Sequence, residues 1–189
     1  MYLFIIPILA GFIFTGASAF TTAYSQRLGE RGGQIVTALL RNVVGIPLWL
    51  IGYLWAWVAP SPWVFPPNVS LSVLGWLFII VGSVPVVIGH VYVGMRSHLP
   101  SMRDTLVSHG LYAYVRHPIY AGGLVILPGL VLIRSSLTIL VASALVFAWL
   151  FVQARLEEID LLQRLPGYRD YMRKVPRFIP RLQRRKSKR

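Results

Sequence analysis

The chain has 189 residues, of which 56% are hydrophobic and 13% charged, whereas a soluble domain carries about 25% charged residues. This composition, with the apolar residues in long blocks, predicts one integral membrane domain. The absence of cysteine excludes disulfides, thiolate catalysis and iron–sulfur clusters. The net charge of +13 lies in loops and in a basic tail. We therefore interpret it as an orientation signal and an anchor on anionic lipid, and not as a nucleic-acid interface.

Five apolar runs predict an all-α polytopic membrane protein with about five transmembrane helices. The runs cover approximately residues 2–24, 35–59, 69–95, 118–133 and 137–152. The first three are long enough to cross a hydrocarbon core of about 30 Å, and the last two are short. A polar turn is expected at residues 29–33, and residues 134–136 predict a tight helical hairpin. Glycines such as Gly11 and Gly122 favour close packing of the helices.

The positions of lysine and arginine predict the orientation of these helices. Basic residues are concentrated in residues 25–34, residues 96–117 and the segment from Arg155 onward, whereas residues 60–68 carry no charge. The positive-inside rule then predicts an outside N-terminus and a cytoplasmic C-terminus. No basic residue precedes the first run, so it does not have the form of a cleavable signal peptide.

The chain becomes amphipathic after the fifth run. Apolar residues recur at spacings of three, which predicts a C-terminal amphipathic helix with an apolar stripe beneath charged residues; they are Leu156, Ile159, Leu162 and Leu165. Pro166 and Gly167 should interrupt this helix before a second short piece that contains Tyr168 and Tyr171.

Residues 109–120 contain two histidines, one arginine and three tyrosines directly before the fourth run. Pro118 suits the first turn of a helix, where its missing N–H costs nothing. Polar, ring-bearing residues at a membrane surface indicate a functional site. The alternative is an interfacial aromatic belt with a snorkelling arginine.

Glu157 and Glu158 are two of only six acidic residues. A carboxylate there could accept hydrogen bonds from a ribose diol or an ammonium group, and the alternative is a solvated helix surface with a pair to Arg164. No metal site is expected, because the four histidines lack the one-turn spacing of a zinc-binding helix. His90, within the third run, is more often a hydrogen-bonded packing residue than a ligand.

Two ordered motifs occupy the C-terminal half of the chain. The first comprises Leu106-Val107, then Gly110-Leu111-Tyr112, then Tyr114-Val115-Arg116-His117-Pro118-Ile119-Tyr120. The second comprises Glu157-Glu158, Leu161-Leu162, Tyr168, Tyr171 and Val175-Pro176-Arg177-Phe178-Ile179-Pro180. Together they resemble the isoprenylcysteine carboxyl methyltransferase family, whose wider group includes bacterial phospholipid methyltransferases. The resemblance covers residues 96–180. It divides the chain into three transmembrane helices of uninformative sequence (1–95), a methyltransferase core (96–180) and a basic tail (181–189).

The resemblance implies a membrane-embedded methyltransferase that uses S-adenosylmethionine and has no Rossmann domain. It implies a cytoplasm-facing cofactor pocket and a lipid or other lipophilic acceptor that enters laterally between the helices. The positions that match the family's cofactor-binding residues are Leu106, Val107, Tyr112, His117, Pro118, Tyr120 and Glu157, with Glu158 as the neighbour of Glu157.

Two positions depart from the family's pattern. Asp104 stands where members often have histidine, and Gln153 stands where many have an arginine that is thought to face the acceptor. A carboxylate acceptor favours a guanidinium partner, so a prenylcysteine substrate is less expected and a phospholipid N-methyltransferase is the alternative. The rival class, a non-enzymatic membrane scaffold or small transporter, predicts no cofactor binding and leaves both motifs unexplained.

The expected chemistry is in-line methyl transfer, promoted by positioning and desolvation. A carboxylate acceptor needs no base, whereas an amine or thiol must first lose a proton. The candidate bases are His117, His109, Glu157 and Asp104. Arg116 or Arg155 is expected to steer an anionic group of the acceptor.

Overall fold

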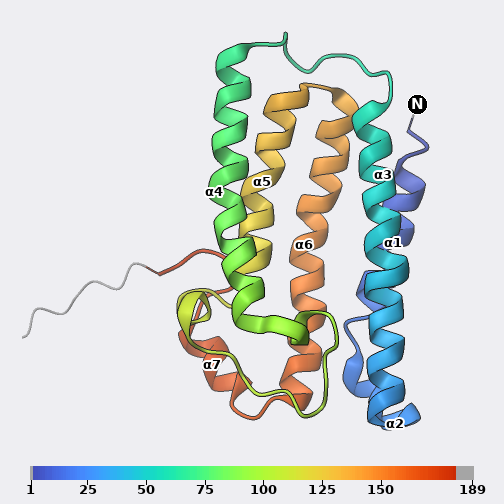
Figure 1. Cartoon of the computed structure of the whole chain (residues 1–189), viewed down its shortest axis with the longest axis vertical. Helices are drawn as coiled ribbons and strands as arrows, with labels where there is room; N and C mark the ends of the chain where they lie inside the picture. Colours follow the sequence, from blue (N-terminus) through green and yellow to red (C-terminus); the bar gives the residue numbers. More distant parts are fainter. Residues whose placement is uncertain (1, 182–189) are drawn as a thin grey trace, which may run out of the picture.

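The computed structural model describes residues 2–181, so the basic tail beyond Arg181 lies outside the described residues. The regular elements of this part are helices, as predicted (Figure 1). They are α1 (Ile5–Ala17), α2 (Thr21–Ala38), the π-helix η1 (Leu39–Gly45), α3 (Ile46–Val58), α4 (Val69–Val93), the 3-10 helices η2 (Gly94–Ser97) and η3 (Gly110–Ala113), α5 (Pro118–Arg134), α6 (Leu137–Arg164) and α7 (Tyr168–Lys174).

Three helical stretches are long and apolar enough to cross a membrane, namely 21–58, 69–97 and 137–164. Helices α1 and α5 are shorter apolar helices. The sequence predicted a long first span and a short fifth one, and the structure reverses this. The first run is divided because α1 ends at Ala17. Just after this end, the Ser18 hydroxyl donates a hydrogen bond to the carbonyl of Thr15 at 2.6 Å. The fifth run continues without a break through the amphipathic segment as α6.

The turn predicted at residues 29–33 is present, but it lies inside the span assigned to α2. Gly29 has φ 75°, a conformation that favours glycine. The chain folds back here, since a Cβ on Gly33 would lie 2.6 Å from the backbone nitrogen of Ser25. The second half of α2 then runs through η1 into α3.

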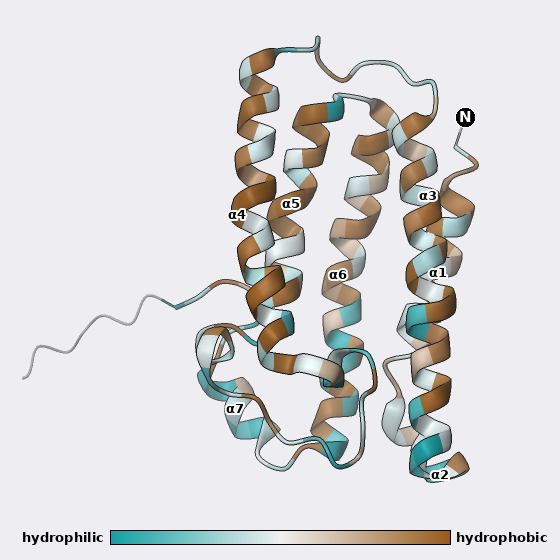
Figure 2. Ribbon diagram, viewed as in Figure 1, coloured by the Kyte–Doolittle hydropathy of each residue, from teal (hydrophilic) through white to brown (hydrophobic). Residues whose placement is uncertain are grey.

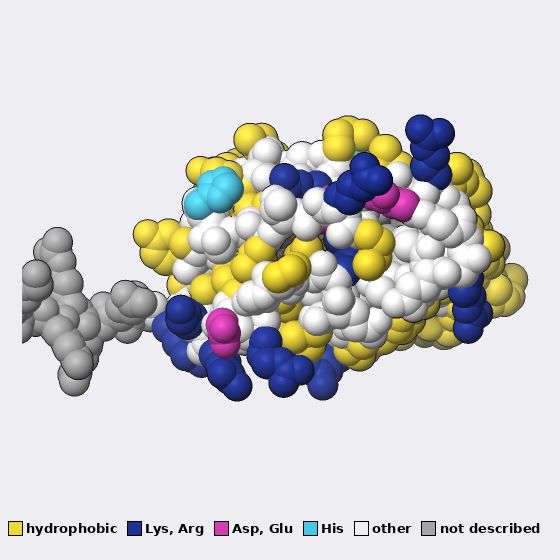
Figure 3. Space-filling model, turned by 90° about the horizontal axis from the view of Figure 1, so that it is seen from below, with side chains coloured by type: hydrophobic (Ala, Val, Ile, Leu, Met, Phe, Trp, Pro, Cys, Tyr) yellow, Lys and Arg dark blue, Asp and Glu magenta, His cyan; other side chains and the backbone are white. Residues whose placement is uncertain are grey.

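The two ends of the molecule differ in polarity. The N-terminus, the loop between α3 and α4 and the turn between α5 and α6 lie at one end, whereas α2, the connector 94–117 and α7 lie at the other (Figure 1). Hydrophilic residues concentrate at the connector end (Figure 2), and lysine and arginine side chains are spread over that face (Figure 3). The segments predicted to be cytoplasmic therefore share one end of the molecule.

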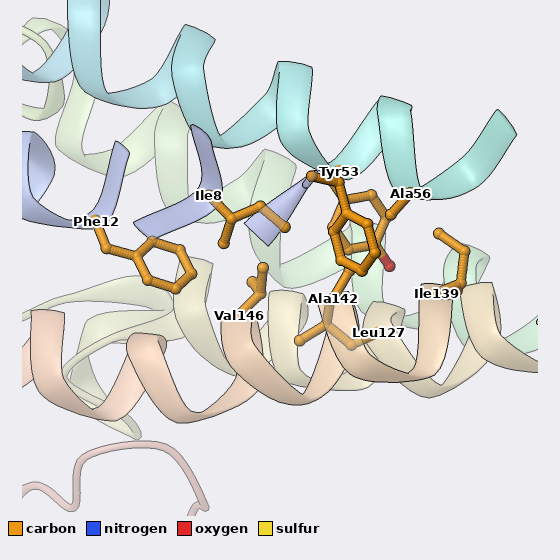
Figure 4. Close-up of a cluster of buried hydrophobic side chains, with 9 residues drawn as sticks. Ile8, Phe12, Tyr53, Ala56, Leu127, Ile139, Ala142 and Val146 are labelled. Carbon is orange, nitrogen blue, oxygen red and sulfur yellow. The ribbon is translucent and has the colours of Figure 1, made fainter. Parts of the chain in front are cut away.

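Helices α1, α3, α5 and α6 meet in a buried apolar core (Figure 4). It includes Phe4, Ile8, Phe12, Tyr53, Ala56, Leu127, Ile139, Ala142 and Val146. The side-chain hydroxyl of Tyr53 is hydrogen-bonded within this core to Ser143 Oγ at 2.7 Å. This core fixes the positions of the helices from which the functional side chains project.

Helices α4 and α5 pack through glycines spaced seven residues apart on α4. A Cβ on Gly82 would lie 2.7 Å from the carbonyl oxygen of Gly122, and a Cβ on Gly75 would lie 2.7 Å from that of Gly129. Small residues allow membrane helices to approach at backbone distance, and Gly89 continues the row towards the start of α5.

We expect Gly82→Ala to lower the free energy of unfolding by about 1–3 kcal/mol, because the methyl group meets backbone and α4 must move away from α5. Thermal unfolding of the purified protein in detergent measures the effect. The control is Val81→Ala on the exposed side of α4. If both variants unfold at the same temperature, the close helix contact is wrong.

Candidate functional site

The arginine–histidine–proline motif lies where the connector enters α5. Helix α5 begins at Pro118, as predicted, with His117 as its N-cap. The backbone N–H groups of Arg116 and His117 donate to the carbonyls of Pro176 and Arg177 at 2.9 and 3.0 Å. The end of the second motif is thus held against the first by main-chain hydrogen bonds.

Glu158 is the centre of a buried ionic cluster. Its side chain is 1% exposed. Arg116 donates to it through Nε at 3.0 Å and Nη2 at 2.9 Å, and Arg177 donates through Nε at 3.0 Å and Nη2 at 2.5 Å. His117 Nε2 lies 3.2 Å from the same carboxylate. This cluster ties α6 to both motifs.

The neighbouring Glu157 faces a different environment, at the wall of a cavity. Its Oε1 accepts hydrogen bonds from Tyr120 at 2.6 Å, Arg41 at 3.1 Å and Gln153 at 3.2 Å. Within the described part of the chain, its Oε2 has only a long contact of 3.9 Å to His117 Nδ1. The His117 ring stacks in parallel on Tyr120, with ring centroids 5.4 Å apart. The two adjacent glutamates therefore differ in environment, since Glu158 is buried in the ionic cluster and Glu157 borders the cavity.

The cavity has a volume of about 640 Å³, and residues of α1, α3, α4, α5, α6 and the connector line it. Its polar end is lined by Arg41, Asp104, Tyr112, His117, Tyr120 and Glu157. Its apolar end is lined by Phe12, Trp49, Leu127, Val146, Trp149 and Leu150. This volume lies within the range of small-molecule and cofactor sites.

Arg164 joins the connector to α6 and α2. It donates to Asp160 at 2.8 Å, to Asp104 at 2.8 Å and to the carbonyl of Ser101 at 2.8 Å. The other oxygen of Asp160 accepts from the backbone N–H of Thr22 at 2.7 Å. The pair between Glu157 and Arg164, considered above as the alternative for Glu157, is replaced by these contacts.

A family model of phospholipid methyltransferases matches residues 70–168 of this chain. The chain belongs to the phospholipid methyltransferase family. The match covers α4, the connector, α5 and α6, and therefore the elements that carry most of the polar end of the cavity.

Two curated bacterial relatives of this family member are named for metal resistance. The cobalt-zinc-cadmium resistance protein CzcN of Cupriavidus metallidurans is 32% identical over 121 residues, which cover 64% of this chain and 52% of that protein. The nickel-cobalt-cadmium resistance protein NccN of Alcaligenes xylosoxydans xylosoxydans is 38% identical over 78 residues, which cover 41% and 37%. The chain thus spans about half the length of these relatives or less. No solved structure matches the chain. Within residues 2–181, no group of three or more histidine and acidic side chains could hold a metal ion.

The structure brings most of the predicted site residues of this family member to one cavity. Its wall includes Leu106, Val107, Tyr112, Arg116, His117, Tyr120 and Glu157. Pro118 and Glu158 are buried behind the wall. Arg155, expected to steer the acceptor, is exposed and lies outside the wall, because it occupies the outward face of α6. Arg116 is held by Glu158 and by the carbonyls of Met172 and Val175.

Arg41 is a site residue that the motifs did not indicate. It belongs to η1, and π-helical turns are frequent at functional sites. Besides Glu157, it reaches Ser18 Oγ at 3.2 Å and the carbonyl of Ser97 at 2.9 Å. A lone arginine inside an apolar run was the available signal, since such residues face a bundle interior or a polar cavity.

The apolar stripe predicted for residues 156–165 is buried only in part. Leu165 is buried against Tyr168 and Tyr171, and Leu156 is half-buried. Ile159 and Leu162 are each 37% exposed, whereas Glu158 and Asp160 are buried. Glu158 and Asp160 are buried because arginine side chains and the backbone N–H of Thr22 supply their polar partners.

Three buried tyrosines of the two motifs line the cavity. Burial raises the pKa of Tyr171 to about 12, and burial also raises the pKa of Tyr112 and of Tyr168 above the ordinary value for tyrosine. These hydroxyls therefore stay protonated at neutral pH. The Tyr171 hydroxyl donates to the carbonyl of Tyr112 at 2.6 Å, and that of Tyr112 points at the carbonyl of Gly89 at 3.4 Å.

Proposed function

We propose that this protein is an S-adenosylmethionine-dependent methyltransferase that acts on a lipophilic acceptor at the membrane surface. The observation that carries the proposal is the two-part cavity. Side chains from both motifs form its polar end, and apolar side chains of α1, α3, α5 and α6 form the other end. A polar cofactor and a lipid chain would then meet inside one enclosure.

The residues at the polar end fit the chemistry of this cofactor. The aromatic faces of Tyr112 and Tyr120 suit a sulfonium cation. Glu157 Oε2, which has no close partner among residues 2–181, suits a ribose hydroxyl or an ammonium group. When bound, the cofactor supplies an electrophilic methyl group. The chain's part is to orient the two reactants and to exclude water.

We further propose that the polar end faces the cytoplasm, because the basic segments of the chain share that end. The acceptor would enter between α3 and α4, both of which line the cavity. These proposals place the N-terminus outside and the cofactor site at the cytoplasmic surface.

The arginines around the cavity support an amine acceptor over a carboxylate. Arg41 is paired with Glu157, Arg116 with Glu158, and Arg164 with two aspartates. Gln153, at the family's arginine position, donates to the carbonyl of Thr15 and to Glu157. A carboxylate acceptor would have to displace one of these ion pairs or bind Arg96, which lines the cavity and donates to the carbonyl of Thr105, whereas an amine would need neither. Methylation of a phospholipid amine is therefore the favoured form of the proposal.

Calorimetric titration of the purified protein with S-adenosylmethionine tests the proposal. We expect saturable binding that Glu157→Gln weakens about 10- to 100-fold, the usual effect of losing a hydrogen bond to a charged group. Asp170→Asn removes a carboxylate that is 71% exposed and should leave the affinity unchanged. A folded protein that binds no cofactor would contradict the proposal and favour the scaffold or transporter.

A further inference from the structure

Each candidate base named from the sequence is paired with a charged group or lies outside the cavity wall. Glu157 and Asp104 are each paired with an arginine of the cavity wall, and protonation would break those ion pairs. His117 is engaged by the buried carboxylate of Glu158 through Nε2 at 3.2 Å, and its Nδ1 faces Glu157 Oε2 at 3.9 Å. His109 packs edge-on against Tyr92, outside the cavity wall. An amine acceptor would therefore need another group to take its proton.

His90, on α4, is a cavity-lining histidine with a free lone pair. Its Nδ1 lies 2.8 Å from the carbonyl oxygen of Val86, one helical turn back. Because a carbonyl only accepts hydrogen bonds, Nδ1 carries the proton, and the neutral ring keeps its lone pair at Nε2. Among residues 2–181, no group is hydrogen-bonded to Nε2. An ionisable residue that lines a cavity within a membrane helix is a candidate functional residue.

The surroundings of His90 connect the cavity to water. The Tyr112 hydroxyl points at the carbonyl of Gly89, the residue before His90, so the first motif adjoins this part of α4. On the other side, the ring of His98 is stacked on that of His90, with centroids 6.0 Å apart. His98 is exposed and can pass a proton to solvent.

We propose that His90 is the general base that prepares an amine acceptor for methylation, an inference that rests on the proposed function. His90 Nε2 takes one proton from the acceptor's ammonium group and leaves a nitrogen lone pair. That lone pair forms the new nitrogen–carbon bond with the methyl group. The carbon–sulfur bond breaks with its electron pair going to sulfur, which becomes a neutral thioether. The proton on His90 then passes to water beside His98.

Methyl transfer to phosphatidylethanolamine in detergent micelles, with a methyl-labelled donor, tests this role. We expect His90→Gln to lower kcat about 10²- to 10⁴-fold, the usual contribution of a general base. Calorimetric affinity for S-adenosylmethionine should stay within twofold of the wild type, which also certifies that the variant is folded. Added imidazole should restore turnover in His90→Ala. The control is Val91→Ala, an exposed neighbour on α4, which should keep wild-type turnover.

The possible outcomes separate this inference from the proposed function. No cofactor binding by the wild-type protein would contradict the proposed function itself. Wild-type kcat in His90→Gln would overturn the role of His90, as would a loss of turnover that imidazole does not restore in a cofactor-binding His90→Ala. A wild-type protein that binds the cofactor but transfers no methyl group to the amine would also overturn it, because only a protonated acceptor needs this base.

Discussion

Glu158→Ala is expected to abolish the folded state of the connector end of the molecule. The change leaves two guanidinium groups and His117 facing one another without the carboxylate that neutralises them. Breaking a buried ion pair by removing one partner costs about 3–5 kcal/mol. That is a large part of the stability of an ordinary domain.

Thermal unfolding in detergent, followed by tryptophan fluorescence, measures this loss. The matched control is Glu157→Ala, the same change one position earlier, where the carboxylate borders the cavity and is 18% exposed. We expect the control to stay folded and to lose cofactor affinity instead. Equal stability of the two variants would show that the Glu158 cluster does not hold the motifs together.

Arg164→Met is expected to release the connector from the helices beneath it. Asp104 and Asp160, which are 11% and 4% exposed, would each lose their cationic partner. The local cost is again about 3–5 kcal/mol, which corresponds to at least about a 100-fold rise in local opening.

Hydrogen exchange of the amides in residues 98–108 reports this opening. Arg173→Met serves as the control, because Arg173 and Asp170 form an exposed pair that contributes little stability. Unchanged exchange in the Arg164 variant, relative to this control, would refute the role of Arg164 as the link between the connector and α6.

The sequence predicted the helical class and several boundaries because these depend on local chemistry. Pro118 begins α5, Ser136 caps α6 through its hydroxyl, and Gly167 precedes α7. The two motifs also indicated the site, because ring-bearing residues and paired carboxylates are rare in so apolar a chain. Each of these features lies within a short stretch of the chain, so it can be recognised without knowledge of the tertiary structure.

The rest of the site depends on contacts between distant parts of the chain. Arg41 is hydrogen-bonded to Glu157 although 116 positions separate them in the sequence, and Arg164 is hydrogen-bonded to Asp104 although 60 positions separate them. Residues 1–95 carry no motif, yet they supply Arg41 and His90 to the cavity. The sequence also could not predict that Ile159 and Leu162 are exposed, because the burial of Glu158 and Asp160 depends on arginines from distant parts of the chain and on local ones.

The main-chain bonds from Arg116 and His117 to Pro176 and Arg177 impose an order on biosynthesis. Synthesis proceeds from the N-terminus, so the transmembrane helices emerge first. A nascent chain that stops before residue 176 has every helix of the bundle but lacks the two carbonyls that hold the motif. The proposed site is therefore complete only after the second motif has been synthesised, when α1 to α6 are already part of the chain.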